Sequence, residues 1–138
     1  MAIKLKKGIK ELVAEAEAEI NTLSTEDAIK RHGDDDLVFI DIRDVRELGK
    51  VGTIPNAVHA PRGMLEFWFD PESPYYKEIF GDENKTYVLF CAAAWRSALA
   101  TKTLQDMGFP NVVHFAAGFG GWKEAGGPVD ESKVKNPS

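Results

Sequence analysis

The feature that most constrains the fold of this chain is an alternation of short apolar runs with segments of helical periodicity. Runs rich in branched and aromatic residues, typical of buried strands, occupy residues 37–40, 58–60, 86–90 and 111–115. Helical segments separate them, the clearest being residues 97–107, which stop at Gly108. Strands separated by helices pair in parallel, and right-handed crossovers place the helices on both faces. We therefore predict a three-layer α/β fold around a mostly parallel sheet.

The domain organisation follows from length and patterning. The 138 residues fit one domain and are too few for two. Apolar residues at helical spacing from Ile9 to Ile20 predict a leading amphipathic helix. Near the other end we expect a loop over 118–121 and a short helix over 122–125. We assign residues 1–22 to a helical extension, 23–128 to the domain and 129–138 to a polar tail that is mobile.

Composition excludes several classes of function. A net charge of −5 without a sustained basic face argues against a nucleic-acid partner. No stretch reaches the about 18 apolar residues of a membrane span, and no apolar signal segment is present. One cysteine cannot form an internal disulfide or a CxxC pair, so we expect a reducing, cytoplasmic setting. The three histidines lack metal-ligand spacing and look structural or exposed, so we expect neither metal nor cofactor.

Cys91 is the candidate for chemistry because of its position. It follows the strand 86–90 directly, and ligands bind at the carboxyl ends of parallel strands, where Asp41 also falls. The helix that begins near Ser97 adds the positive end of its dipole, which favours a thiolate. We expect backbone N–H groups to converge on the sulfur from Ala92, Ala93, Ala94, Trp95 and Arg96. The alternative is a cysteine that only packs in the core.

Four segments, in order, resemble the rhodanese family. Cys91 to Ser97 resembles its active-site loop, in which a cysteine begins a six-residue loop that ends in arginine. The other three segments are Asp41-Ile42-Arg43 with Glu47, Gly52-Thr53-Ile54-Pro55-Asn56-Ala57 and Gly118-Phe119-Gly120-Gly121-Trp122. The resemblance implies a rhodanese-like fold with a five-stranded sheet. Ala94 stands where the family usually has glycine, and we expect it to keep a negative φ.

The resemblance also implies a reaction. A rhodanese-type sulfurtransferase would use the Cys91 thiolate to attack the terminal sulfur of a small anionic donor such as thiosulfate. The sulfur would then pass from the Cys91 persulfide to a thiophilic acceptor. Arg96 would either clamp the donor or form an ion pair that holds the loop. Asp41, Arg43 and Ser97 are expected to support the site, with Thr53, in place of the family's histidine, as part of the scaffold.

Two other functions are compatible with the same residues. A persulfide carrier or protein-binding module, served by a sulfur-trafficking partner, is favoured somewhat by the lack of charge in the loop before Arg96. A phosphatase or arsenate reductase needs a wider loop with one more residue between cysteine and arginine than the four found here. The oligomeric state is also open, with a dimer contact as one use of the aromatic residues 67–69.

Overall fold

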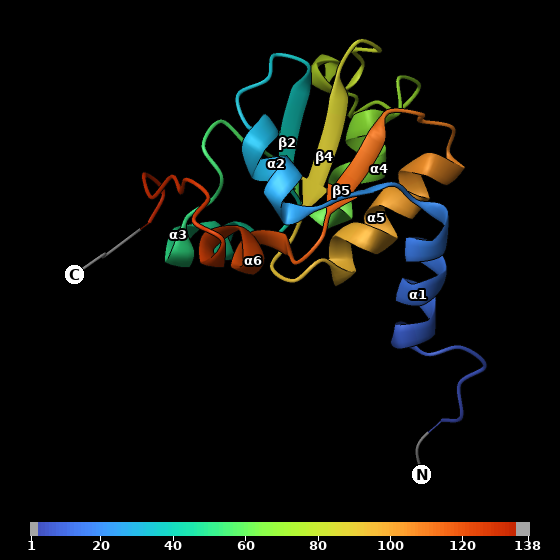
Figure 1. The fold of residues 1–138 in the computed structure, drawn as a ribbon. Helices are drawn as coiled ribbons and strands as arrows, with labels where there is room; N and C mark the ends of the chain where they lie inside the picture. Colours follow the sequence, from blue (N-terminus) through green and yellow to red (C-terminus); the bar gives the residue numbers. More distant parts are fainter. Residues whose placement is uncertain (1–2, 135–138) are drawn as a thin grey trace.

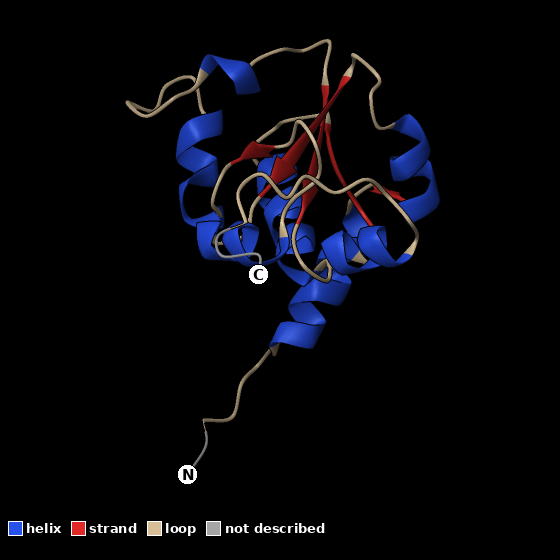
Figure 2. Cartoon of the chain, turned by 90° about the vertical axis from the view of Figure 1, so that its left-hand side faces the viewer, coloured by secondary structure: helices blue, strands red, loops and turns tan. Residues whose placement is uncertain are grey.

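The computed structural model describes residues 3–134 as a sheet between two layers of helices (Figures 1 and 2). The sheet has five strands in the order β1-β5-β4-β2-β3, and every neighbouring pair is parallel. The α/β fold with a five-stranded sheet is thus confirmed, and the sheet proves parallel throughout. The strands are β1 (Thr22–Leu23), β2 (Leu37–Asp41), β3 (Val58–His59), β4 (Thr86–Phe90) and β5 (Val112–Phe115).

The helices fall into two groups. The α-helices are α1 (Ile9–Glu19), α2 (Thr25–Arg31), α3 (Val45–Val51), α4 (Leu65–Phe69), α5 (Trp95–Asp106) and α6 (Gly118–Glu124), and 3₁₀ turns span Arg62–Met64 and Glu78–Phe80. Helices α4 and α5 share one apolar core with the sheet, and α2 and α6 share the other. Helix α1 packs on the outside of α5 (Figure 1). No helix within residues 3–134 is long and apolar enough to cross a membrane.

The central strands are apolar on both faces because both faces are covered. On β2, Ile40 belongs to the core under α4 and α5, whereas its neighbour Phe39 belongs to the core under α2 and α6. On β4, Leu89 and Val88 divide in the same way. Successive side chains of a strand point to opposite faces, so a run with no polar position fits a strand buried on both sides. This burial fixes the register that brings Asp41 beside Phe90, at the common end of the two strands.

Helix α1 is joined to the domain by apolar and polar contacts. Val13, Ala16 and Ile20 are buried against Ala98 of α5. The Gln105 side chain also donates a hydrogen bond to the Glu19 carbonyl at 2.9 Å. The boundary that we expected between residues 22 and 23 falls inside β1, so the end of the predicted extension forms part of the sheet.

Three local expectations need correction. The loop expected over 118–121 is the first turn of α6, and α5 begins at Trp95 rather than at residue 97. The tail expected from residue 129 is fastened at its start, because Asp130 exchanges two backbone hydrogen bonds with Thr53, at 2.7 and 3.0 Å. Residues 135–138 of that tail lie outside the described residues. The glycines in the first turn of α6 and the alanines before Trp95 carry little periodicity, so the sequence pattern does not mark where these two helices begin.

Candidate active site

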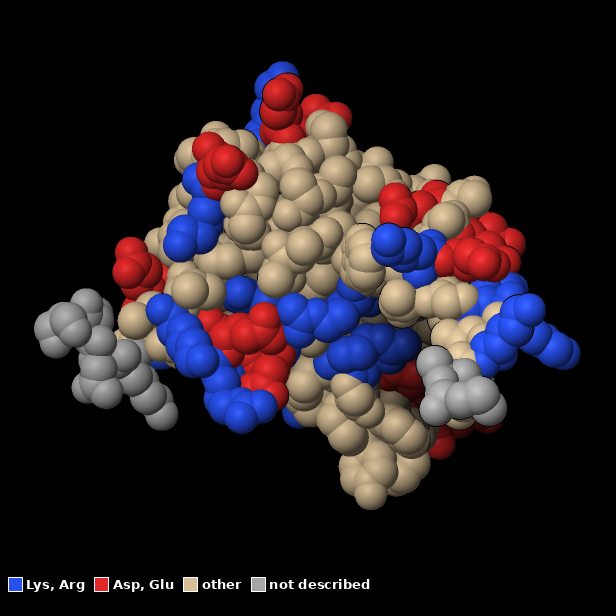
Figure 3. Space-filling model, turned by 90° about the horizontal axis from the view of Figure 1, so that it is seen from below, with Lys and Arg blue, Asp and Glu red and all other residues tan. Residues whose placement is uncertain are grey.

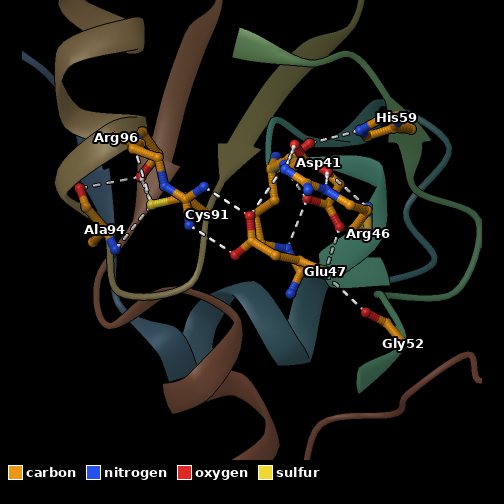
Figure 4. A network of polar contacts seen from close by, with 11 residues as sticks. Asp41, Arg46, Glu47, Gly52, His59, Cys91, Ala94 and Arg96 are labelled. Carbon is orange, nitrogen blue, oxygen red and sulfur yellow. Dashed lines mark hydrogen bonds and ion pairs between the residues drawn. The ribbon is translucent and has the colours of Figure 1, made fainter. Parts of the chain in front are cut away.

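The Cys91 sulfur lies in the loop between β4 and α5 (Figure 4). It accepts hydrogen bonds from the backbone N–H of Ala94 at 3.1 Å and of Ser97 at 3.4 Å. The Cys91 side chain is 1% exposed. Of the loop N–H groups expected to converge on the sulfur, the structure brings Ala94 there. Those of Ala92, Ala93, Trp95 and Arg96 make no hydrogen bond within residues 3–134. N–H donors without acceptors beside a thiol favour an anion over a neutral group.

Ala94 has a conformation that contradicts the sequence prediction. Its φ is +84° and its ψ is −5°, in the left-handed region, whereas we expected a negative φ. The loop must reverse direction at this point to direct the Ala94 N–H at the sulfur and then enter α5. That path needs the left-handed conformation, which glycine adopts without strain and alanine does not. The loop therefore keeps the geometry suited to glycine while holding an alanine.

Backbone hydrogen bonds join the first turn of α6 to the loop. The N–H groups of Phe119 and Gly120 donate to the carbonyls of Cys91 and Ala92 at 2.7 and 3.0 Å. Gly118 has a φ of +59°, and a Cβ there would lie 2.7 Å from the carbonyl oxygens of Cys91 and Ala92. Glycine is needed because the two backbones approach so closely. The contact turns the first two carbonyls of the loop away from the sulfur, and this explains the Gly-Phe-Gly segment physically.

A buried ion pair joins the end of β2 to the segment around Gly52 and Thr53. The Asp41 carboxylate accepts from Arg43 Nε at 2.9 Å and from an Arg43 terminal nitrogen at 2.7 Å. It also accepts from Thr53 Oγ1 at 2.6 Å, and Arg43 donates to the Gly52 carbonyl at 2.8 Å. Both charged side chains are at most 2% exposed. The Arg43 guanidinium lies over the Phe119 ring of α6, 4.5 Å from its centre. This group makes contacts within the scaffold and none with the sulfur.

Arg96 is engaged in an ion pair. Its two terminal nitrogens contact the two carboxylate oxygens of Glu47, on α3, at 2.9 and 3.0 Å (Figure 4). Glu47 also accepts from the Asp44 N–H and so completes the capping box of α3. The Arg96 hydrogen bonds lower the pKa of Glu47 against an opposing effect of burial, and Glu47 raises the pKa of Arg96. Of the two roles left open for Arg96, the structure displays the ion pair that holds the loop.

Basic side chains surround the loop on the outer surface. Figure 3 views the molecule from the side of α3 and α6 and shows Lys and Arg across the middle of this face, interspersed with acidic residues. A cavity of about 340 Å³ lies here and is lined by Arg43, Glu47, Lys50, Val51, Ala92, Phe119, Gly120 and Lys123. Neither Lys50 nor Lys123 forms an ion pair within the described part of the chain. Sequence inspection missed these lysines because they lie far from Cys91 along the chain.

The side chains of Ser97 and His114 form a chain of polar contacts that starts at the Cys91 sulfur. The Ser97 Oγ atom lies 3.7 Å from Cys91 Sγ and 2.9 Å from His114 Nδ1. His114 Nε2 lies 3.1 Å from Thr22 Oγ1. Burial lowers the pKa of His114 to about 4, so the imidazole is neutral at physiological pH. No local sequence pattern indicates this arrangement, because the alternation of β5 places His114 in the sheet but does not show which neighbour it faces.

The other loop residue expected to bind substrate is Trp95, whose side chain is 49% exposed. It stands at the start of α5, where a neighbouring molecule or a bulky substrate can reach it. His32 and His59 each contact a backbone carbonyl, of Pro55 and Arg43 respectively, and so lie away from the sulfur. Within residues 3–134, no group of three His, Cys, Asp or Glu side chains is placed to hold a metal ion.

Fold and site together define a parallel α/β protein that presents a thiol to backbone donors at the ends of its central strands. A family model described as the rhodanese-like domain matches residues 24–125, and the chain belongs to this family. The match covers all four segments that carried the resemblance.

Three relatives illustrate the similarity. A Rhodopseudomonas palustris protein of unknown function, described as a possible tyrosine phosphatase, is 50% identical with a TM-score of 0.90, covering 94% of this chain and 99% of that one. The polysulfide-sulfur transferase homodimer of Wolinella succinogenes is 34% identical with a TM-score of 0.67, covering 88% and 85%. A Bacillus subtilis protein, YrkF, named as a candidate sulfur carrier, is 31% identical over 93 residues, or 67% of this chain. The chain spans between 28% and 57% of the length of the curated relatives that it matches, 45% in the case of YrkF.

Proposed function

We propose that the protein is a rhodanese-type sulfurtransferase that carries a sulfane sulfur on Cys91. The observation that carries this proposal is the pair of backbone N–H donors, from Ala94 and Ser97, on the Cys91 sulfur. They stabilise the thiolate, which is the nucleophilic form of cysteine. The free N–H groups elsewhere in the loop are suited to receive one more sulfur atom. The sulfur-transferring relative from Wolinella succinogenes, which is similar over most of both chains, supports the same chemistry.

The reaction has two covalent steps. The Cys91 thiolate attacks the outer sulfur of thiosulfate, the sulfur–sulfur bond of the donor breaks, and sulfite leaves with the electron pair. The enzyme then holds the transferred sulfur as a Cys91 persulfide. A thiophilic acceptor such as cyanide attacks that outer sulfur, thiocyanate forms, and the Cys91 thiolate leaves. No oxidant or cofactor enters, because the sulfur moves at a constant total oxidation level.

The surroundings of the loop support an anionic donor. Lys50 and Lys123 line the cavity beside Ala92 without acidic partners among the described residues. Cationic side chains at a concave site raise the local concentration of anions such as thiosulfate or polysulfide. Arg96 is held by Glu47 and so positions the loop, with a contribution to the field at the sulfur rather than a direct clamp on the donor.

A persulfide carrier is the alternative, and one observation favours it. The loop has no charge before Arg96, and Arg96 is already paired, so the loop itself offers little to hold a dianion. The similarity to the Bacillus subtilis candidate sulfur carrier points the same way. In this role Cys91 would receive sulfur from a protein partner and pass it on. The half-exposed Trp95 would then lie in the contact with that partner.

Phosphatase chemistry, suggested by the description of the Rhodopseudomonas palustris relative, fits this loop less well. Four residues separate Cys91 from Arg96, and the Arg96 guanidinium faces Glu47. A phosphoryl group needs a wider cradle and a free guanidinium for its three outer oxygens.

The test is thiocyanate production from thiosulfate and cyanide by the full chain and by Cys91→Ala. We expect turnover with the native chain and none with C91A. A protein that makes no thiocyanate, yet gains one sulfur atom by mass spectrometry when mixed with polysulfide, would be a carrier. Hydrolysis of a phenyl phosphate that depends on Cys91 would contradict both sulfur-based functions. Lys50→Ala and Lys123→Ala separate donor capture from chemistry, because loss of a cationic rim raises KM for thiosulfate and leaves kcat nearly constant.

A further inference from the structure

Cys91 is connected to the surface by a line of polar side chains. Ser97 Oγ lies between the sulfur, at 3.7 Å, and His114 Nδ1, at 2.9 Å. The other imidazole nitrogen, Nε2, lies 3.1 Å from Thr22 Oγ1. The four groups come from the loop, α5, β5 and β1. Each contact is within the range of a hydrogen bond, with the sulfur contact the longest.

The two ends of this line differ in their access to water. Cys91 is 1% exposed and His114 is 2% exposed, whereas Thr22 is an exposed residue of the edge strand β1. A thiol that is buried to this degree has little contact with bulk solvent, so direct loss of its proton to water is slow. The line through Ser97 and His114 therefore offers the proton a path to solvent that the burial of the sulfur otherwise blocks.

We propose that Ser97, His114 and Thr22 relay the proton of the Cys91 thiol to solvent at the edge of the sheet. The S–H bond breaks and its proton moves to Ser97 Oγ, while the hydroxyl proton of Ser97 moves to His114 Nδ1. The proton on His114 Nε2 moves to Thr22 Oγ1, and the hydroxyl proton of Thr22 passes to water. One proton leaves, and His114 ends as the other neutral tautomer. Persulfide formation needs this step whenever the enzyme starts from the thiol.

The chemistry of the three side chains suits this role. A neutral imidazole has one donor and one acceptor nitrogen and can exchange them, and a hydroxyl can donate and accept at once. His114 stays neutral because burial opposes its charged form. Ser97 has a second acceptor, the Ala94 carbonyl at 3.2 Å, which holds the hydroxyl near the sulfur when the relay is idle. Nearby charge comes from Arg96, paired with Glu47, and it stabilises the thiolate without offering a base.

The relay rests on the proposed function only in taking Cys91 as the nucleophile, and its test needs no sulfur donor. A stopped-flow pH jump on the full chain, from about pH 6, where His114 is neutral, to alkaline pH, follows the ultraviolet absorbance of the Cys91 thiolate. Thr22→Val keeps the shape of the side chain and removes the last hydroxyl. We expect thiolate formation to slow by roughly a hundredfold, at the low end of positioned acid–base effects. Thr22→Ser should restore the native rate.

Controls separate a relay from a structural role. Thr101→Val removes a buried hydroxyl from the same helix as Ser97, one that has no hydrogen-bond partner within residues 3–134, and should leave the rate unchanged. The final thiolate absorbance and the urea unfolding midpoint of T22V should match those of the native chain, which a general loosening of the site would not allow. If T22V does not fold, His114→Gln tests the same point, because an amide keeps two polar atoms but cannot exchange tautomers.

A native rate in T22V, or in H114Q where T22V does not fold, would overturn the relay. Thiocyanate production is measured separately on the same variants, so the two proposals can fail independently. Slow thiolate formation in T22V with no thiocyanate from the native chain would contradict the sulfurtransferase and keep the relay. Thiolate formation at the native rate in T22V, together with thiocyanate production by the native chain, would contradict the relay and keep the sulfurtransferase.

Discussion

Replacing Ala94 by glycine should stabilise the protein, although glycine usually destabilises a folded chain. Ala94 stands at the start of α5 with φ at +84°, where its Cβ crowds the neighbouring carbonyl. Glycine has no Cβ and adopts this conformation freely. The Ala94 N–H remains available to the Cys91 sulfur in the variant, because the hydrogen bond uses only the backbone.

The magnitude follows from two opposing effects. Relief of the left-handed strain is worth about 1–2 kcal/mol for a residue other than glycine. The greater freedom of glycine in the unfolded chain costs about 0.4–1 kcal/mol. Glycine is also the better residue at the position before a helix, by a few tenths of a kcal/mol or more. The free energy of unfolding should therefore rise by about 1 kcal/mol.

Urea unfolding of the native chain and of two variants measures this effect. Ala93→Gly is the matched control, because Ala93 is an exposed residue of the same loop and its φ is not positive. We expect A93G to lower the free energy of unfolding by about 0.5–1 kcal/mol, in the opposite direction from A94G. Equal losses of stability in the two variants would refute the reasoning. The urea dependence of the unfolding free energy must stay constant for the comparison to hold.

Three further predictions concern the scaffold around the loop. Gly118→Ala should lower the free energy of unfolding by at least about 2 kcal/mol and abolish sulfur transfer, because the new Cβ would lie 2.7 Å from two loop carbonyl oxygens. Gly33→Ala is the control: Gly33 also has a positive φ, but no described atom lies within 4 Å of the new Cβ, so activity in the thiocyanate assay should be kept. Thr101→Val should raise the free energy of unfolding by about 1 kcal/mol, because it removes a buried hydroxyl that has no hydrogen-bond partner in the described part of the chain. A lower urea midpoint than that of the native chain would contradict this. His114 takes up its proton near pH 6.5 in the unfolded chain but only near pH 4 in the folded chain, so the free energy of unfolding should fall by up to about 3 kcal/mol as the pH drops from 6.5 to 4. Urea titrations at several pH values measure this dependence, and H114Q should lack the part that His114 contributes.

The central part of the fold could be predicted from the sequence because burial on two faces leaves a strong pattern. β4 is a run of β-branched, aromatic and aliphatic residues that ends directly before Cys91, and this pattern predicts both the strand and the position of the thiol. β1 escaped prediction because a strand of two residues, Thr22 and Leu23, has no detectable periodicity. Its place at the edge follows from tertiary pairing with β5, which no local pattern encodes.

The site was only partly within reach of sequence reasoning. The loop, the buried Asp41 and Arg43 side chains and the Glu47 position could be located because they stand in recognisable segments. The positive φ of Ala94 could not be predicted from the sequence, because alanine normally adopts the right-handed region. In this loop the backbone has to direct the Ala94 N–H at the Cys91 sulfur, and that requirement sets the conformation. The contact of His114 with Ser97 depends on the register of β5 against the start of α5, which is set by three-dimensional packing alone.

The close approach of α6 to the loop limits how this site could be moved to another protein. The loop holds its shape because Phe119 and Gly120 bind the carbonyls of Cys91 and Ala92, across a gap that admits only glycine at position 118. A designer who grafts the heptapeptide from Cys91 to Ser97 onto a foreign scaffold would transfer the nucleophile without the α6 segment that holds the loop in shape. A working transplant would have to carry both pieces of chain, spaced as they are here, as one inseparable cassette.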